Sequence, residues 1–426
     1  MRWTHPEHPG RGLRLAYCIN LHPAEDLDGV RAGLERVTRP LAERLGGAGA
    51  FGVGPWLPAS VAADLARDPA QAAALFPCEE LDAFTYNAFP FGGFHREGLK
   101  AEVFAPGWHQ PERLAFTLDV ARVALAAAAP GEGHLSISTH TGGHGPAFRE
   151  GELALACARE LARAALALAR LEEEHGRRLV LSLEPEPRSA AGDTLELVLL
   201  WRRIRTDGVE AAARAEGVAP ERVAAAVARH LGTCLDACHA AVEFEAPGLA
   251  FANATHEGAP LGKLQFSSAL ALPAPAADAR GRELLFDLHE PVYLHQVTGR
   301  GEHALVRVGD LDELRARWEQ GDAALRACEE WRCHFHVPVD LDAPAGADTG
   351  GLATTRAAGD ALLRTVLAAP ERWGTSDLHV EIETYTWDVL PGSLRGDGEL
   401  LDGLEREYRH VLALLESEGW QRAETS

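Results

Sequence analysis

Two hydrophobic periods alternate along most of this chain. Short segments repeat apolar residues at every second position, as β-strands do, and longer segments repeat them every three or four positions, as amphipathic helices do. The strand pattern occurs in nine segments on this path: 13–21, 51–57, 84–89, 135–140, 179–184, 233–236, 263–267, 333–339 and 378–385. Helical spacing follows in 27–45, 59–75, 111–129, 152–175, 194–205, 220–230, 311–330, 354–368 and 400–417. This sustained alternation predicts a parallel sheet closed into a (β/α)8 TIM barrel.

A closed barrel of this class has eight strands, so one of the candidates must lie outside it. We suspect 263–267 or the first strand, 13–21, and the pattern does not decide whether 263–267 or 333–339 supplies the seventh barrel strand. Alternating segments at 292–297 and 305–308 flank a glycine-containing turn, which predicts a β-hairpin within an insertion over about 268–310. We see no repeat and no domain boundary, and therefore expect one domain over 1–426.

The strand 179–184 carries the first candidate chemistry. Its leucines alternate with other residues, its last residue is Glu184, and prolines follow at once. Barrel enzymes build their sites from side chains at the carboxyl ends of the strands, and alternate strand residues face the barrel axis. Other candidate strands repeat this arrangement with His379, Glu381 and Glu383, with His334 and His336, and with Asp236 followed by His239 in a D-x-x-H pattern.

Polar residues gather at the same predicted edge. They include Asn20, His22, Asn87, His140 and Gln265, and the loop 90–100 adds His95. So many acids and imidazoles in one pocket would repel one another, or be costly to bury, unless a cation compensated them. We therefore predict a divalent metal; mixed nitrogen and oxygen ligands suit Mn²⁺, Zn²⁺, Fe²⁺ or Co²⁺, and the sequence does not choose among them. Phe91 and Phe94 have no partner in a predicted helix or strand, so we expect the loop 90–100 to close over the pocket.

The composition of the chain argues against some classes of binding partner. The chain has 41 Lys+Arg against 63 Asp+Glu, a net charge of −22 that would repel nucleic acids and anionic lipids. Its seven cysteines are scattered without a disulfide framework, as in reduced cytoplasmic proteins. No run approaches the roughly 18 apolar residues of a membrane span. We expect a cytoplasmic protein that is not an integral membrane protein, binds no nucleic acid and takes a small-molecule metabolite.

The chain resembles a known superfamily and, more closely, one family. Glu184, Asp236-x-x-His239, His334-x-His336 and Glu383 resemble the metal site of the xylose isomerase-like barrels, which include sugar isomerases, epimerases and the endonuclease IV group. Over about 13–391 the chain resembles the EboE family of metabolite traffic proteins. The motifs that carry this resemblance are YCINLHP, FTYNAFPFGGFH, LSLEPEP, CLDACHAAVEFE, YLHQV, HFHVP and HVEIETYTWDVLP.

This resemblance implies a TIM barrel linked to the movement or processing of a secondary-metabolite precursor, with other Ebo proteins as possible partners. It implies metal ligands at Glu184, Asp236, His336 and Glu383, and it makes His239 a ligand or a residue that touches substrate; we predict it as a ligand. We expect substrate contacts at Asn20, His22, Asn87, His95, His140, Gln265, His334 and Glu381. One departure is that Gln265 stands where the superfamily has a ligand histidine. If 263–267 is the seventh strand, we expect weakened metal binding and a displaced His336.

Two functions follow. The first is an EboE-like protein that acts on, or hands over, a small metabolite precursor. The alternative is a metal-dependent sugar or sugar-phosphate isomerase or epimerase that uses Glu184 and Glu383 for proton transfer. The acidic charge balance disfavours a third possibility, phosphodiester cleavage of the endonuclease IV type.

Overall fold

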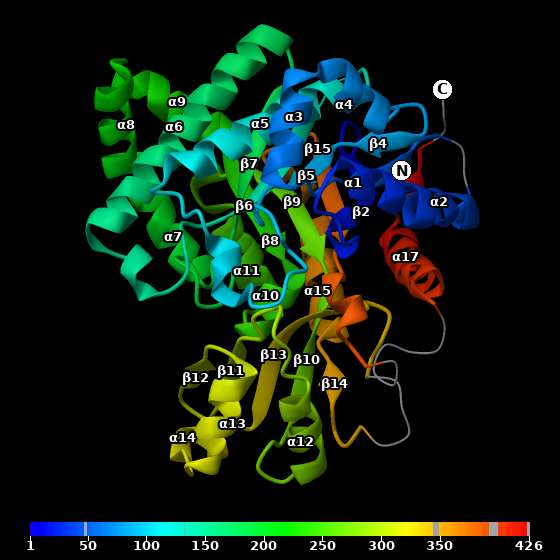
Figure 1. The fold of residues 1–426 in the computed structure, drawn as a ribbon, viewed down its shortest axis with the longest axis vertical. Coiled ribbons are helices and arrows are strands. Elements are labelled where there is room, and N and C mark those ends of the chain that lie inside the picture. Colours follow the sequence, from blue (N-terminus) through cyan, green and yellow to red (C-terminus); the bar gives the residue numbers. More distant parts are fainter. Residues whose placement is uncertain (47–48, 132, 344–348, 392–398, 424–426) are drawn as a thin grey trace.

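The computed structural model describes residues 1–46, 49–131, 133–343, 349–391 and 399–423. Its centre is a ring of parallel strands that closes where the last strand pairs with the first (Figure 1). The ring contains β2 (Gly12–Cys18), β3 (Phe51–Gly54), β4 (Leu81–Ala83) with β5 (Thr85–Asn87), β6 (His134–His140), β7 (Arg178–Glu184), β8 (Leu231–Asp236), β9 (Leu261–Phe266) and β15 (Asp377–Ile382). The short strands β4 and β5 together occupy one position of the ring, because β4 pairs with β3 and β5 pairs with β6. The predicted (β/α)8 TIM barrel is therefore confirmed.

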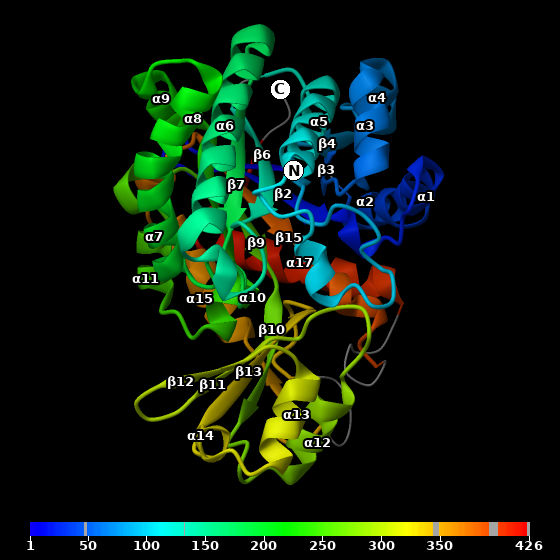
Figure 2. The same ribbon diagram turned by 60° about the vertical axis from the view of Figure 1, so that its left-hand side comes forward.

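Helices surround this ring, as Figures 1 and 2 show. The longest, α6 (Gly151–His175), buries Cys157, Leu161 and Leu168 at helical spacing and ends at Gly176, whose φ of +69° suits a left-handed cap. The other helices of this layer and of its loops are α1 (Leu27–Gly33), α2 (Arg39–Leu45), α3 (Ala59–Arg67), α4 (Pro69–Leu75), α5 (Pro111–Ala127), α7 (Thr194–Arg203), α8 (Val209–Glu216), α9 (Pro220–His230), α10 (Ala237–Val242), α11 (Pro247–Ala254), α15 (Arg356–Leu367) and α17 (Leu400–Ser417). Short strands β1 (Arg2–Thr4) and β16 (Gln421–Arg422) pair beside β2 and bring the two ends of the chain together.

The seventh barrel strand is β9, which pairs in parallel with β8 on one side and β15 on the other. Our suspicion that 263–267 or the first strand lies outside the barrel is wrong. The strand outside is β13 (Glu330–Val337). Lys263 does not prevent β9 from entering the barrel, because its ammonium group forms a buried ion pair with Glu381 of β15.

A second sheet lies beyond the carboxyl ends of β8 and β9, in the lower part of Figure 1. It is antiparallel, with the order β12-β11-β13-β10-β14, and its own apolar cluster includes Leu272, Phe286, Trp331 and Phe335. Its remaining elements are β10 (Ser268–Pro273), β11 (Val297–Arg300), β12 (Leu305–Val308), β14 (Ala353–Thr354), α12 (Ala279–Asp287), α13 (Leu311–Glu319) and α14 (Ala323–Arg326).

The expected hairpin is present in this sheet as β11 and β12, although its first strand lies at 297–300 rather than 292–297. The sheet continues well past the expected end of the insertion at 310, because β13 and β14 both pair with β10. The assignment of 1–426 to one domain stays a prediction. Among the helices described, none has both the length and the apolar character to cross a membrane.

Candidate metal centre

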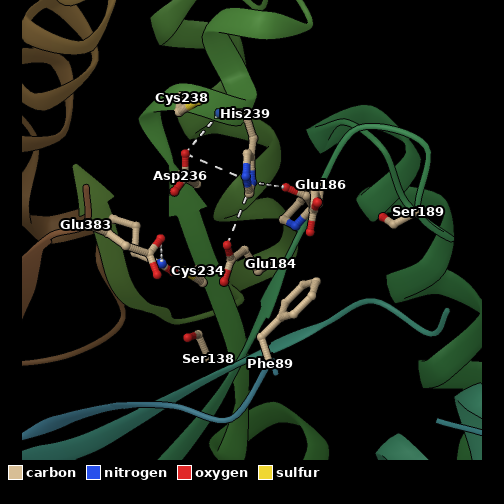
Figure 3. Close-up of polar contacts among 12 residues, drawn as sticks. Phe89, Ser138, Glu184, Glu186, Ser189, Cys234, Asp236, Cys238, His239 and Glu383 are labelled. Carbon is tan, nitrogen blue, oxygen red and sulfur yellow. Dashed lines mark hydrogen bonds and ion pairs between the residues drawn. The ribbon is translucent and has the colours of Figure 1, made fainter. Parts of the chain in front are cut away.

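Three carboxylates meet at the carboxyl end of the barrel, as predicted from the strand ends. Glu184 is the last residue of β7, Asp236 is the last residue of β8, and Glu383 follows β15 (Figure 3). All three are buried, and one oxygen from each lies within 4.8 Å of the other two. Oε2 of Glu184 and Oδ2 of Asp236 are buried and accept no hydrogen bond from the described residues. These two oxygens have the lone pairs that a cation needs.

The pKa values of the three carboxyl groups show how strongly burial disfavours their ionised forms. Burial, strengthened by the neighbouring carboxylates, raises the pKa of Glu184 well above its ordinary value and that of Glu383 to about 8. Burial also raises the pKa of Asp236. The nearby ammonium group of Lys263 pairs with Glu381 instead. A divalent cation among the three carboxylates would favour their ionised forms, so the donor set fits a metal ion.

Glu383 is oriented by three side-chain amides. Its Oε1 accepts from Nδ2 of Asn20 at 2.7 Å and from Nδ2 of Asn87 at 3.0 Å, and its Oε2 accepts from Nε2 of Gln265. Gln265 in turn accepts from the Cys234 thiol at 2.6 Å. The structure thus places three predicted substrate residues against a predicted metal ligand, where they fix the direction of its carboxylate.

Three imidazoles lie beside the carboxylates. His239 belongs to α10, whose first turn is capped by Asp236 through Oδ1 and the His239 N–H at 2.9 Å. His334 and His336 come from β13 in the second sheet, and both face the barrel. The Nδ1 of His336 donates to the Glu383 carbonyl at 3.0 Å. The expectation that a barrel strand at 263–267 would displace His336 is therefore wrong.

Burial lowers the pKa of each imidazole below its ordinary value. The pKa falls to about 3 for His239, to about 4 for His336 and well below the ordinary value for His334. All three rings are therefore neutral at physiological pH, which is the form that binds metals.

A pocket with about 480 Å³ of empty space, part of it open to solvent, borders these groups. Its polar lining consists of Asn20, Asn87, Glu184, Glu186, His239, His334, His336 and Glu383. The rest of its lining, called the apolar wall here, is largely apolar and contains Phe89, Pro90, Phe94, Leu99, Val103, Tyr293, Leu294 and Tyr385, with Lys100 beside them. A ligand in this pocket would meet both metal-binding groups and aromatic rings.

The loop 90–100 forms part of the apolar wall. Phe94 packs against Tyr293 and Tyr385, with ring centroids 5.2 and 5.1 Å apart, and Phe91 packs against Phe116. The premise that these aromatics lack partners is wrong, because their partners come from segments distant in sequence. Closure of the loop over the pocket stays a prediction.

Five predicted substrate residues do not line the pocket: Gln265, which donates to Glu383, and four others. His22 contacts the Tyr17 hydroxyl, His95 donates through Nε2 to the Asn20 carbonyl at 2.7 Å, and the His140 ring packs against Phe89. Glu381 pairs with Lys263 inside the barrel. Their contact with substrate stays a prediction.

The pocket also contains residues that we did not select from the sequence, among them Glu186 and Tyr385. Burial raises the pKa of Glu186 to about 8. The signal for Glu186 was its position two residues beyond Glu184, in the same strand phase, in the motif Glu-Pro-Glu. Tyr385 follows the last barrel strand and had no comparable pattern.

Comparison with known proteins adds little to this geometry. No protein-family model matches the chain, and no curated protein does, so the resemblance to the EboE family stays a prediction. One similar solved structure is an L-ribulose 3-epimerase, with a TM-score of 0.43 and 12% identity over 95% of each chain. Another is IolI protein with a bound zinc atom, with a TM-score of 0.41 and 9% identity over 95% of this chain and 99% of that one. Likeness at this level carries no inference about chemistry, so the barrel assignment rests on the strand pairing.

Proposed function

We propose that this protein is a divalent-metal-dependent isomerase or epimerase acting on a small polyhydroxy or keto substrate. The observation that carries the proposal is the group formed by Glu184, Asp236 and Glu383, three buried carboxylates at the carboxyl ends of β7, β8 and β15. Glu184 and Glu383 line the pocket, and two oxygens of the group accept no hydrogen bond from the described residues. These three residues would hold the cation. When bound, it would polarise substrate oxygens and acidify the carbon between them.

The protein's own groups would bind the substrate and move its proton. We assign proton transfer to Glu184 and Glu383, which both line the pocket. Because Oε2 of Glu184 is assigned to the cation, Glu184 would move the proton through its other oxygen, Oε1. Asn20, Asn87 and Gln265 hold the Glu383 carboxylate in one orientation. A fixed base close to the substrate carbon is what proton abstraction requires. The aromatic wall would exclude water from the reacting carbon.

A second candidate is a metabolite carrier of the EboE kind, which would bind its ligand without turnover. The apolar wall favours it, since Phe94, Tyr293 and Tyr385 suit a ligand with an apolar part better than a simple sugar. The two candidates share the pocket and differ in whether a carbon–hydrogen bond breaks.

Deuterium exchange tests this difference. The metal-loaded protein would be incubated in D₂O with a panel of ketoses, aldoses and hydroxyketones, and solvent deuterium at the carbon next to the carbonyl would be measured by mass spectrometry. We expect exchange that stops on chelation and falls at least 100-fold in Glu184→Gln. Glu407→Gln, a buried carboxylate outside the pocket, serves as the control and should keep the exchange. Metabolites that co-purify with the protein and bind without exchange would overturn the isomerase proposal in favour of the carrier.

A further inference from the structure

The three imidazoles at the barrel mouth form a triangle of nitrogen atoms. Nε2 of His334 lies 3.1 Å from Nε2 of His239 and 3.0 Å from Nε2 of His336, and the third edge, between His239 and His336, is 3.4 Å. We infer that His239, His334 and His336 form a metal site of their own, separate from the three carboxylates, which takes a borderline transition-metal cation such as Zn²⁺.

The size of the triangle fits such a cation. Zinc–nitrogen bonds of roughly 2.0–2.1 Å in tetrahedral coordination place neighbouring ligand nitrogens about 3.3–3.4 Å apart. The observed edges of 3.0, 3.1 and 3.4 Å come close to this spacing before any cation draws the rings into place. Three imidazoles with an open fourth position are also the ligand set of several catalytic zinc centres.

The proton positions in the rings support the same conclusion. Each Nδ1 donates to an oxygen: His239 to the Pro185 carbonyl at 2.9 Å, His334 to Oε1 of Gln296 at 2.6 Å, and His336 to the Glu383 carbonyl at 3.0 Å. A carbonyl oxygen can only accept, so Nδ1 carries the proton in His239 and His336. Each neutral ring then has a bare Nε2.

The Gln296 side chain fixes the proton of His334 as well. Its Nε2 group donates to Oε1 of Glu186 and to the Pro187 carbonyl, both at 3.1 Å, so its Oε1 must face the ring. His334 therefore also protonates Nδ1. Three unprotonated Nε2 atoms then lie within 3.4 Å of one another in a buried position. The Tyr385 hydroxyl, 3.4 Å from Nε2 of His334, can donate to one of them, whereas a cation would satisfy all three.

The carboxylate group is a separate site because the rings turn their other nitrogens toward it. Nδ1 of His239 lies 3.7 Å from Glu184, and Nδ1 of His336 lies 3.4 Å from Oε2 of Glu383. Those Nδ1 atoms already donate to backbone carbonyls, so they cannot ligate a cation held by the carboxylates. The predicted five-residue ligand set thus divides into an oxygen site and a nitrogen site, and His334, which we had assigned to substrate, joins the nitrogen site.

The two sites suit different metals. All-oxygen ligands favour Mg²⁺ or Mn²⁺, whereas imidazole favours Zn²⁺, Co²⁺ or Fe²⁺. Asp236 lies close to both, since one of its oxygens is within 4.8 Å of ligand atoms of Glu184 and Glu383 and one is within 4.8 Å of His239 and His336. The three histidines and Tyr385 all line the pocket, and the Tyr385 hydroxyl lies 3.4 Å from Nε2 of His334, so a ligand in the pocket would lie beside the nitrogen site.

Metal titration of the full chain tests this inference without any substrate, so its outcome is independent of the isomerase proposal. The protein would be stripped with a chelator and titrated with Co²⁺ and, separately, with Mn²⁺. We expect Co²⁺ to give the intense visible absorption of tetrahedral nitrogen coordination at one equivalent, and Mn²⁺ to bind a second site that bound Zn²⁺ does not block. A single shared site, or Co²⁺ with only the weak spectrum of octahedral oxygen coordination, would overturn the inference.

Two variants separate the sites. His334→Asn should weaken Zn²⁺ and Co²⁺ binding at least 100-fold and leave Mn²⁺ binding within about threefold. Glu383→Gln should weaken Mn²⁺ binding about 10- to 100-fold and leave Zn²⁺ and Co²⁺ binding within about threefold. His230→Asn is the matched control, because His230 is also buried but its Nδ1 donates to the Leu179 carbonyl at 2.9 Å, and it does not line the pocket. Zinc affinity unchanged in a folded His334→Asn protein would refute the assignment. If that variant does not fold, the titrations of the unaltered protein still decide the question.

Discussion

The sharpest single test of the oxygen site is Glu383→Gln. This change keeps the shape of the side chain and removes the charge of one proposed ligand. Loss of one carboxylate should lower Mn²⁺ affinity by about one to two orders of magnitude, which is roughly 1.4–2.8 kcal/mol of binding free energy.

The stability of the metal-free protein should change much less. Burial already raises the pKa of Glu383 to about 8, so the group is largely protonated at neutral pH and an amide is close in shape and charge. Asn20 and Asn87 can keep an oxygen acceptor at Oε1, and only the bond from Gln265 loses its acceptor. We therefore expect a cost near one neutral hydrogen bond, about 0.5–1.5 kcal/mol of unfolding free energy.

The measurement pairs metal titration with denaturant unfolding in chelator. Glu407→Gln is the matched control, because Glu407 is also buried with its pKa raised to about 8 but accepts from Thr384 Oγ1 and the Val339 N–H, away from the pocket. It should show a similar stability cost and unchanged Mn²⁺ affinity. Our reasoning fails if Glu383→Gln costs more than about 3 kcal/mol without metal, the range for breaking a buried ion pair, while Mn²⁺ affinity is unchanged.

Three further outcomes are expected. Lys263→Met should destabilise the protein by about 3–5 kcal/mol in urea unfolding, because it leaves the buried Glu381 carboxylate unpaired; the double variant with Glu381→Leu should recover most of this loss, and no recovery would contradict the pairing. Glu245, with its pKa raised to about 8 by burial, is more easily protonated in the folded than in the unfolded chain, so its contribution to stability is present at low pH and is lost as pH rises toward 8. Glu245→Gln should therefore gain stability relative to the unaltered protein between pH 5 and pH 8, and a constant difference would show that Glu245 is ionised throughout. Phe94→Ala should cost about 3–5 kcal/mol by the same unfolding assay, and a loss below 1 kcal/mol would show that its aromatic contacts are loose.

Local sequence predicted most of the barrel strands and the polar residues at their carboxyl ends. Glu184 and Asp236 were identifiable because proline or a helix-capping pattern ends each strand directly after the acid. The polar phase of β13 was also right, since His334 and His336 share one face and Phe335 lies on the other with the second apolar cluster. The local pattern could not show which sheet each strand joins. The strands β9 and β13 show the same alternation of apolar and polar residues, although β9 belongs to the barrel and β13 to the second sheet.

The partners of buried polar groups were equally hard to foresee. Glu381 faces the barrel axis as predicted, but it forms an ion pair with Lys263 on the neighbouring strand, which the sequence pattern did not indicate. Asn20 and Asn87 were expected to contact substrate, and each donates to Glu383. Which donor meets which acceptor depends on strand register between segments hundreds of residues apart, and single-strand periodicity does not encode it.

The three ligands of the nitrogen triangle come from two parts of the molecule. His239 lies on α10 of the barrel, and His334 and His336 lie on β13 of the second sheet. A cation held there would bridge them, so metal occupancy would be coupled to the docking of the second sheet. Binding at a free-metal concentration 100 times the dissociation constant stabilises the docked form by about 2.7 kcal/mol, if the undocked form does not bind. Metal depletion would then loosen the strands of the second sheet first, as a local opening visible in amide hydrogen exchange while the barrel strands stay protected. In such a protein, metal supply would control the shape of the pocket as well as its chemistry.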